Sequence, residues 1–580
     1  MLRIRSQPPG MIARRVAIVC SAALLAVSSA PEAGAQSYRW PIDVPKRVTS
    51  TFGEFRSTRF HHGLDVSTGG KRGFRVVAAE RGYVSAVMYE NYGIGYAVFV
   101  RHPDGRTTFY GHMDRFADGI LANARVRRHI EHIRNHRDFR VDFSKPEIPL
   151  RRGTPIGYSG DSGAGLEHFH FEVRDKNNVH LNPLRYALWV PDATAPVIET
   201  VYLTPLDRFS RVDGTPGEKA YRATLVNRKE GRYVLAGNAV PRIAGRVGVK
   251  ARVHDTVGWR NKVTAYGFNW YVDGVKRHRL FFDKIVRAYT HRMGLIYDYD
   301  TSNSRHFTFY LYARTSGDGV INAGAPGGTR RARAEFFDAR LNRSIIEFSC
   351  RAEPPAPEPA PGFDHNLVPG SALVLTSADG RCTLSFPDTA ALYPEMVAME
   401  QSPLPQNVLS GLPVLSARYA VTPTHLCIDS TARIRIAYDG ADHRTVGIYS
   451  VNAAGTGIGF VSNSYHLKER AFYATVRRMG RYVLARDEIP PVIRHRNPKR
   501  PRPNTQLRFT VSDRGSGVDL SKISLAVDGK SVFWYFDVDY RAVVILPHNP
   551  IWAKGAHTVT MTIVDRAGNR SAPLTYEYEQ

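Results

Sequence analysis

The sequence predicts a mostly β protein built from several modules: an N-terminal antiparallel β domain with a helical insertion, followed by several β-sandwich modules. Three observations lead to this fold class. The 580 residues exceed what one hydrophobic core can organise, so several domains are expected. Most apolar segments are short, rich in β-branched and aromatic residues, and bounded by Gly, Asp and Pro, as is typical of strands joined by tight turns. Similar turn sequences also recur along the chain.

Residues 1–35 have the pattern of a secretory signal peptide. Two arginines precede an apolar run over 16–30, and Ala33-Gly34-Ala35 provides a small-residue cleavage site. The run is shorter than the ~18 residues that a membrane-spanning helix needs, although an uncleaved N-terminal anchor is the alternative. The residues before Cys20 lack the small side chain of a lipoprotein site. We therefore expect an exported protein, in the periplasm, the cell envelope or outside the cell, with no transmembrane segment after signal removal.

Residues 36–190 form the predicted N-terminal domain. Segments 75–79, 82–87 and 96–100 are β-branched and aromatic runs bounded by Gly and Asp, which predicts an antiparallel sheet. The stretch of about 118–149 breaks this pattern, because it is strongly basic and has a helix-forming composition. We expect a helical insertion there, between strands.

Repeated segments divide the rest of the chain into modules. Residues 193–198 and 489–493 are similar in sequence and mark two module starts, and Asp-Gly pairs at 273–274 and 528–529 predict hairpins. Another turn sequence recurs at Asp255–Gly258, Asp513–Gly517 and Asp565–Asn569. The predicted modules are a β-sandwich at 191–352, a Pro-rich linker at 353–361, a β-rich module at 362–488 and an immunoglobulin-like module at 489–580.

The composition narrows the classes of partner. The formal net charge is +26, which in an exported protein suits anionic polymers of the cell envelope such as peptidoglycan, teichoic acid or lipopolysaccharide; envelope proteins are a further partner class. Nucleic acid is not expected, because no zinc finger, helix-turn-helix or aromatic RNA-binding motif is found. Signal cleavage would leave Cys350, Cys382 and Cys427, which allow at most one disulfide of open pairing.

A histidine and an aspartate four residues apart begin a candidate metal site. His61 and Asp65 flank Gly63, which permits a tight backbone and lets both side chains converge on one ion. A hydrolytic zinc site needs three such protein ligands, with water in the fourth position. A third ligand must therefore come from another segment.

Two further segments supply more histidines. His168 and His170 flank Phe169 in a predicted strand, so both imidazoles leave the same face while the phenylalanine points into the core. One of this pair can complete the zinc ligands. The other, together with His112 at the end of another predicted strand, remains for acid–base work.

The three segments in this order resemble the lysostaphin-type (LytM-like) zinc endopeptidases of peptidoglycan. Their signature runs His-x-x-x-Asp, Tyr-x-His and then His-x-His, and the resemblance extends over about residues 38–186. It also includes Thr51-Phe52-Gly53, Gly157-Tyr158-Ser159-Gly160 and the residues 170–174. The C-terminal 90 residues resemble immunoglobulin-like modules of bacterial surface proteins.

The resemblance implies a role for each residue of the three segments. His61, Asp65 and His170 match the family's zinc ligands, which implies one Zn²⁺ per chain, and His112 and His168 match its two non-ligating catalytic histidines. Which of these two is the general base is left open. The chain departs from the family pattern at Leu166-Glu167, where Gly-Pro is usual, and in the length of its insertion. Neither departure removes a ligand.

The leading hypothesis is an exported zinc endopeptidase that hydrolyses peptide bonds in peptidoglycan stem peptides or cross-bridges, with the β modules positioning it on the wall. A second hypothesis is a non-catalytic activator of other cell-wall hydrolases, because some relatives have lost zinc ligands. A third is an extracellular protease or adhesin that its β modules target. The sequence leaves open which bond is cleaved.

Overall fold

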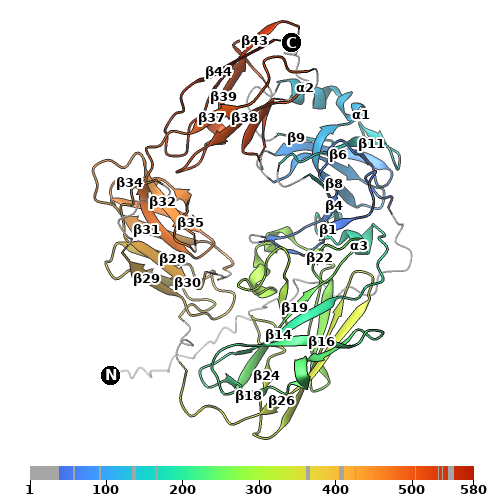
Figure 1. The fold of residues 1–580 in the computed structure, drawn as a ribbon, viewed down its shortest axis with the longest axis vertical. Coiled ribbons are helices and arrows are strands. Elements are labelled where there is room, and N and C mark those ends of the chain that lie inside the picture. The colour runs from blue at the N-terminus through green and yellow to red at the C-terminus, as the bar shows by residue number, and fades with distance from the viewer. Residues whose placement is uncertain are drawn as a thin grey trace, which may run out of the picture.

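The computed structural model describes residues 38–56, 59–90, 93–132, 139–163, 167–360, 366–403, 411–424, 426, 428–452, 454–502, 505–532, 534–537, 540–545 and 554–579. The predicted signal peptide, Leu166 and Cys427 lie outside these residues. The predicted fold class is confirmed: the protein is mostly β, with mainly antiparallel sheets and short helices near the N-terminus (Figure 1). Within the described residues no helix is long and apolar enough to cross a bilayer.

The N-terminal domain is built on one large antiparallel sheet with strand order β1-β4-β12-β8-β7-β6-β10. These strands are β1 (Val48–Ser50), β4 (Leu64–Ser67), β12 (His168–Arg174), β8 (Thr107–Phe116), β7 (Gly95–Arg101), β6 (Gly82–Glu90) and β10 (Pro149–Leu150). Further strands pair at its margins: β5 (Arg75–Val77), β9 (Phe139–Asp142), β11 (Pro155–Ser159) and β13 (His180–Leu181). A two-stranded hairpin, β2 (Phe55–Arg56) with β3 (Arg59–Phe60), lies beside β4 in the sequence.

The stretch predicted as a helical insertion contains two helices and then returns to the sheet. Helices α1 (Asp118–Leu121) and α2 (Ala124–His132) bury Ile120 and Val126 in the domain core. Strand β9 follows and pairs with β6, because its buried Phe139 and Val141 alternate with exposed residues at the period of a strand. A third short helix, α3 (Pro183–Tyr186), is capped by the Asn182 side chain.

The second module is one connected sheet that folds over on itself, because Phe268 packs against Phe309 from the other end of the strand order, with ring centroids 6.0 Å apart. The strand order is β21-β20-β25-β26-β17-β16-β14-β19-β23. Its strands are β14 (Val197–Pro205), β15 (Arg211–Val212), β16 (Lys219–Asn227), β17 (Arg232–Leu235), β18 (Arg242–Ala244), β19 (Arg246–His254), β20 (Gly267–Val272), β21 (Val275–Phe281), β23 (Thr308–Tyr310), β24 (Ile321–Asn322), β25 (Thr329–Phe337) and β26 (Arg343–Ala352). The free cysteine Cys350 is buried in it. The Asp-Gly turn at 273–274 joins β20 to β21, as in a hairpin.

The third and fourth modules each consist of two facing antiparallel sheets. The third has β27 (Leu373–Thr376), β28 (Cys382–Phe386), β31 (Ala432–Ala437), β35 (Ala471–Val476) and β34 (Ser464–His466) in one sheet, and β29 (Ala398–Ser402), β30 (Arg418–Thr422), β36 (Arg481–Arg486), β32 (Val446–Val451) and β33 (Ile458–Ser462) in the other. The fourth has β37 (Val492–His495), β38 (Leu507–Ser512), β42 (Ala542–Ile545) and β41 (Trp534–Asp537), then β40 (Lys530–Ser531), β39 (Ser524–Val527), β43 (Ala556–Thr562) and β44 (Leu574–Glu579). Each pair of sheets encloses its own apolar core.

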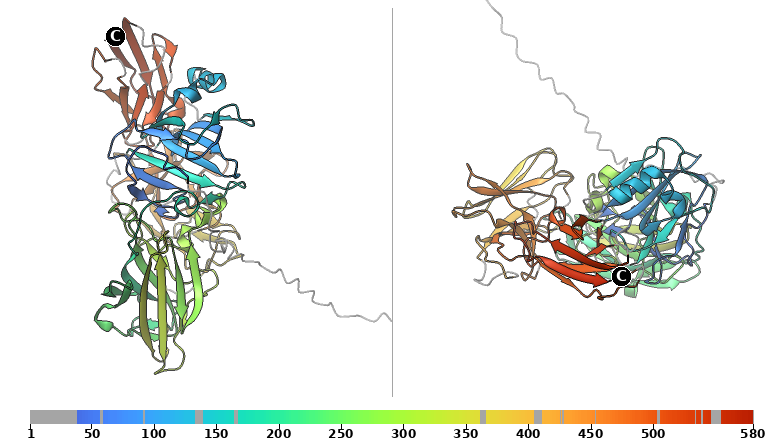
Figure 2. Two further views of the ribbon diagram at one scale, coloured as in Figure 1. Left: turned by 90° about the vertical axis from the view of Figure 1, so that its right-hand side faces the viewer. Right: turned by 90° about the horizontal axis from the view of Figure 1, so that it is seen from above.

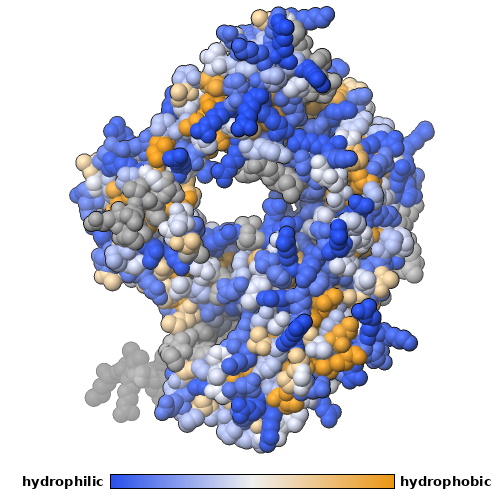
Figure 3. Space-filling view, in the orientation of Figure 1, coloured by the Kyte–Doolittle hydropathy of each residue, from blue (hydrophilic) through white to orange (hydrophobic). Residues whose placement is uncertain are grey.

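The four modules are arranged as a closed ring around a central opening (Figures 1 and 3). The surface around the opening is largely hydrophilic in Figure 3. Seen edge-on in Figure 2, the C-terminal module lies directly against the N-terminal domain, with the second module on its other side. Ala542 and Val544 of the C-terminal module belong to the same buried cluster as the N-terminal core. The C-terminal module and the N-terminal domain therefore pack against each other.

The N-terminal domain and the second module share a continuous core. Strand β22 (Lys284–Ile285), from the second module, pairs with β13 and so extends the N-terminal sheet. Next to it, the fully buried Phe282 packs so closely on Gly53 that a Cβ there would lie 2.4 Å from the ring. Tyr297 stacks on Phe282 and donates a hydrogen bond to the Gly53 carbonyl oxygen.

Removing the Phe282 ring should therefore destabilise the N-terminal domain and the second module together. We expect Phe282→Ala to lower the free energy of unfolding by about 3 kcal/mol, the lower end of the range for a large buried aromatic residue replaced by alanine. Phe209→Ala is the control, since Phe209 is 43% exposed. The measurement is the midpoint of the first transition in urea. An unchanged midpoint for Phe282→Ala, or an equal loss in the control, would contradict a shared core.

Candidate functional site

His61 and Asp65 are brought together by a tight turn between β3 and β4. Gly63 has no room for a side chain, because an added Cβ would lie 2.5 Å from the Phe171 carbonyl oxygen and 2.7 Å from the His170 ring. The backbone therefore passes directly against β12. This close approach supports the sequence-based expectation that Gly63 allows the two side chains to converge.

Strand register adds the third residue. In β12, Phe169 and Phe171 are fully buried on one face, and the two histidines lie on the other. His170 stands opposite Asp65 of β4 on one side and opposite Gly111 of β8 on the other. The period of two along β12 and the pairing with β4 together place the candidate ligands in one spot.

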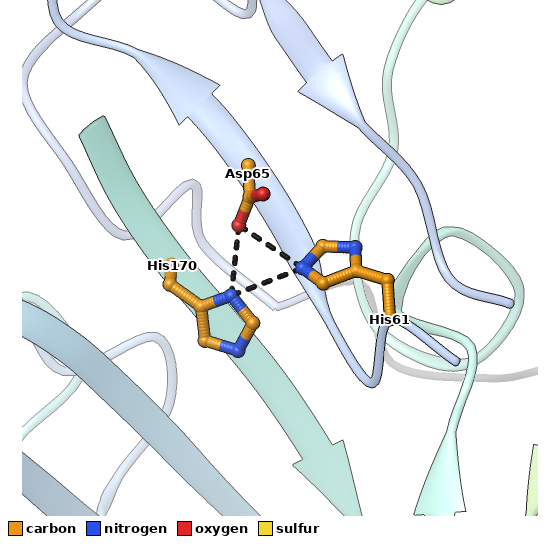
Figure 4. Close-up of side chains that lie close together, drawn as sticks. All are labelled: His61, Asp65 and His170. Carbon is orange, nitrogen blue, oxygen red and sulfur yellow. Dashed lines mark hydrogen bonds and ion pairs between the residues drawn. The ribbon is translucent and has the colours of Figure 1, made fainter. Parts of the chain in front are cut away.

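Three ligand atoms converge at this point (Figure 4). His61 Nε2 lies 3.1 Å from Asp65 Oδ1, His170 Nδ1 lies 2.8 Å from the same oxygen, and the two nitrogens are 3.2 Å apart. Ligands at 2.0–2.1 Å around a tetrahedral ion stand about 3.3 Å from one another. The spacing of the three atoms is therefore close to what a shared zinc ion requires.

The tautomers of both histidines fit a cation. His61 Nδ1 lies 2.8 Å from the Thr51 carbonyl oxygen, which can only accept, so Nδ1 carries the proton and Nε2 keeps a lone pair. His170 Nε2 donates to Glu172 Oε1 at 3.1 Å, so Nδ1 is the ring nitrogen that faces Asp65. Without a metal, a proton on Nδ1 joins it to Asp65 Oδ1 at 2.8 Å, and a metal ion would take the place of that proton. The donor set suits zinc.

Charged residues that the sequence interpretation did not assign hold these ligands in place. Arg56 Nη2 donates to Asp65 Oδ2 at 3.1 Å, so Oδ1 is turned toward the histidines. Glu172, which orients His170, is itself paired with Arg174 at 2.7 Å. Partners of this kind fix ligand orientation and tune metal affinity. Glu172 could have been found from the period of two that relates it to His170; Arg56 lies on a neighbouring hairpin and gave no such signal.

The pKa shifts follow from burial and from these neighbours. Burial lowers the pKa of His61. Burial alone would raise the pKa of Asp65, but His61 and His168 hold it well below its usual value, so the carboxylate is ionised. Burial likewise opposes charge on His170, yet hydrogen bonds with Asp65 and Glu172 raise its pKa to about 9.

His112 and His168 lie together beside the three ligands. Their ring centroids are 4.6 Å apart, and the His112 ring is 5.7 Å from that of His170. His112 Nδ1 donates to the Ser162 carbonyl oxygen at 3.0 Å, which leaves Nε2 as the acceptor. Burial and the neighbouring histidines hold the pKa of His112 well below 6.5, so it is neutral at pH 7. The structure thus brings all five predicted residues together.

Other modules reach both sides of this site. His62 Nε2 lies 2.6 Å from Thr290 Oγ1 of the second module, and the His62 ring stacks on His180. Burial, followed by His180, lowers the pKa of His62 to about 3. On the other side, Asp161 pairs with Arg72, and burial raises the pKa of Asp161 to about 6.

Residues of the C-terminal module also influence the pKa of the Asp161 carboxylate. After burial and Arg72, Asp537 raises the pKa of Asp161 and Arg508 lowers it. The preceding residue, Gly160, is bridged to His168. Glu167 contacts Arg72 at 3.6 Å.

The chain was compared with known proteins. Residues 59–129 match the sequence profile of Peptidase family M23. This stretch includes His61, Asp65 and His112, and the chain therefore carries an M23 peptidase region within its N-terminal domain. No curated protein matches the chain.

Several solved structures are similar to the N-terminal domain. One is a mutant catalytic domain of the prophage-encoded M23 protein EnpA from Enterococcus faecalis, 24% identical over 26% of this chain and 96% of that chain (TM-score 0.19). A second is a zinc-containing peptidase from Vibrio cholerae, 21% identical over 26% of this chain and 41% of that chain (TM-score 0.19). A third is the SpoIIQ–SpoIIIAH pore-forming complex, 21% identical over 26% of this chain and 92% of that chain (TM-score 0.20).

Gly63 offers a test of the site's geometry that leaves every ligand in place. A methyl group at this position cannot be accommodated without displacing the His170 ring. We expect Gly63→Ala to weaken zinc binding at least about tenfold, the lower end of the effect of disturbing ligand orientation. The measurement is competition with a chromophoric chelator. Gly119→Ala, where an added Cβ meets nothing within 4 Å, is the control. Equal zinc affinities in the two variants would contradict the assignment.

Proposed function

We propose that the chain is an exported, zinc-dependent endopeptidase that hydrolyses peptide bonds in peptidoglycan stem peptides or cross-bridges. One observation carries the proposal: the atoms His61 Nε2, Asp65 Oδ1 and His170 Nδ1 converge on a common point with the spacing of tetrahedral ligands. The M23 peptidase match supports the reaction class. We propose these three residues as the ligands of one Zn²⁺ per chain.

When bound at such a site, zinc lowers the pKa of a water molecule and polarises the scissile carbonyl. In our proposal the protein's own residues then move the protons. His112 is neutral and presents Nε2, so it is suited to accept a proton from the attacking water. His168, which is more exposed, is suited to steady the oxyanion and to protonate the leaving amine.

The choice of peptidoglycan as substrate rests on the family resemblance, and the charge of the chain agrees with it. A net charge of +26 attracts anionic envelope polymers. We propose that the β modules position the N-terminal domain on the wall or on a partner protein. In this proposal the second module, whose Thr290 contacts His62 beside the candidate site, also limits which substrates enter.

Alanine variants should separate ligands from proton-transfer residues. We expect His170→Ala to lose both zinc and wall-lytic activity. His112→Ala and His168→Ala should keep near-stoichiometric zinc and lose about 10²–10⁴-fold in kcat, the usual contribution of general acid–base catalysis. Zinc is measured by elemental analysis of the purified protein. His466→Ala, on an exposed histidine of the third module, is the control.

The substrate is tested by incubating the protein with purified sacculi and identifying the released peptides by mass spectrometry. Cleavage within stem peptides or cross-bridges supports the proposal, and the fragments name the bond. Cleavage of added extracellular proteins but not of sacculi would favour the third hypothesis. Zinc-free protein that still stimulates an amidase would show a non-catalytic activator instead.

A further inference from the structure

Two groups of three aspartates occupy equivalent places in the second and fourth modules. One carboxylate oxygen from each member of a group lies within 4.8 Å of the others. The first group is Asp192, Asp255 and Asp338, and the second is Asp487, Asp513 and Asp565. None of the six belongs to the site described above.

The two groups are built in the same way from distant parts of the sequence. Asp192 stands five residues before the start of β14, and Asp487 stands five residues before the start of β37, each with a proline directly before the strand. Asp255 follows the last residue of β19, and Asp513 follows the last residue of β38. The first two members of each group therefore arise from a linker and from the end of a neighbouring strand.

The third member of each group is fixed by an asparagine four residues later. Asn342 Nδ2 donates to Asp338 Oδ2 and to the Asp192 carbonyl oxygen. Asn569 Nδ2 donates to Asp565 Oδ2 and, in the same manner, to the Asp487 carbonyl oxygen. The same aspartate–asparagine contact thus joins the linker to the module in both the second and the fourth module. A chance cluster of acidic residues would not repeat these contacts.

Buried carboxylate oxygens in both groups lack a partner within the described part of the chain. Asp255 is only 2% exposed, and its Oδ1 accepts no hydrogen bond. Asp192 Oδ2 and Asp513 Oδ1 are likewise buried without a hydrogen-bond partner. Among the described residues, no Lys, Arg or His forms an ion pair with any of the six aspartates. Burial, then the neighbouring Asp338, raises the pKa of Asp255 well above its usual value.

Three carboxylates this close and this buried repel one another, and removing them from water without a counter-charge is costly. The surrounding donors satisfy only part of their oxygens. All the offered ligands are oxygens, without His or Cys, which selects hard cations over zinc. The irregular loops that supply them suit Ca²⁺, which accepts varied geometry, better than Mg²⁺, which requires a near-ideal octahedron.

We propose that each aspartate group binds one Ca²⁺ ion, giving two calcium sites per chain in addition to the zinc site. Each ion would join a linker aspartate to two loops of the module that follows. The sites lie at the start of the second and fourth modules, and they fix how these modules are joined to the N-terminal domain and to the third module.

The test is calcium titration of the full-length chain, first stripped of metal on a chelating resin and then reloaded with one equivalent of zinc. Isothermal titration with CaCl₂ should give two sites with affinities on the order of 10⁻⁴ M, as in extracellular modules, and MgCl₂ should bind more weakly. Asp192→Asn and Asp513→Asn should each weaken one site at least about tenfold, because each removes one charge from a three-carboxylate site. Asp388→Asn, on an exposed residue of the third module, should retain both sites.

A second measurement keeps the proposal testable should a variant fold poorly. Saturating Ca²⁺ should raise the unfolding temperature of the wild-type chain by about 2 °C or more, since a ligand of the folded state stabilises it. Absence of calcium uptake at millimolar concentration overturns the proposal. So does tighter binding of Mg²⁺, or unchanged calcium binding in both the Asp192→Asn and Asp513→Asn variants.

Discussion

The geometry of the candidate site depends on two histidine ring nitrogens, each of which donates a hydrogen bond to a fixed acceptor. His61 donates from Nδ1 to a backbone carbonyl, and His170 donates from Nε2 to Glu172, so neither histidine can turn its other ring nitrogen away from Asp65. Arg56 completes the arrangement by holding the other oxygen of that aspartate. Without a metal, a proton on His170 Nδ1 joins this nitrogen to Asp65. The fold therefore holds the three ligand atoms in place before an ion arrives, and metal binding would release that proton.

Much of this site follows from strand periodicity alone. Alternation along one strand is sufficient to predict that His168 and His170 share a face, and the glycine between His61 and Asp65 indicates a tight backbone there. What the sequence could not supply is the pairing of strands distant in the chain. Arg56 reaches the site from a hairpin, and that position depends on tertiary packing that local patterns do not encode.

The sequence predicts which kinds of module the protein contains, but not how these modules pack against one another. Recurring turns indicate β modules, and the basic stretch after residue 118 indicates helices, though its second half returns to the sheet through alternating Phe139 and Val141. Nothing in the sequence indicates that Phe282 packs on Gly53, because 229 residues separate them and no local sequence pattern links the two positions. The modules predicted to act as targeting elements thus also form part of the surroundings of the site.

Because the four modules form a closed ring (Figure 1), a change in one junction between modules affects the other junctions. The junction between the second and third modules is held by Arg292, which forms two hydrogen bonds with Asp429. The junctions that precede the second and fourth modules contain instead the two aspartate groups, where repulsion between carboxylates opposes the same closure. In our calcium proposal, an ion at Asp487, Asp513 and Asp565 would stiffen the linker before the C-terminal module, whose Asp537 and Arg508 influence the pKa of Asp161. Because Gly160, next to Asp161, is bridged to His168, we expect calcium at this junction to affect the candidate active site.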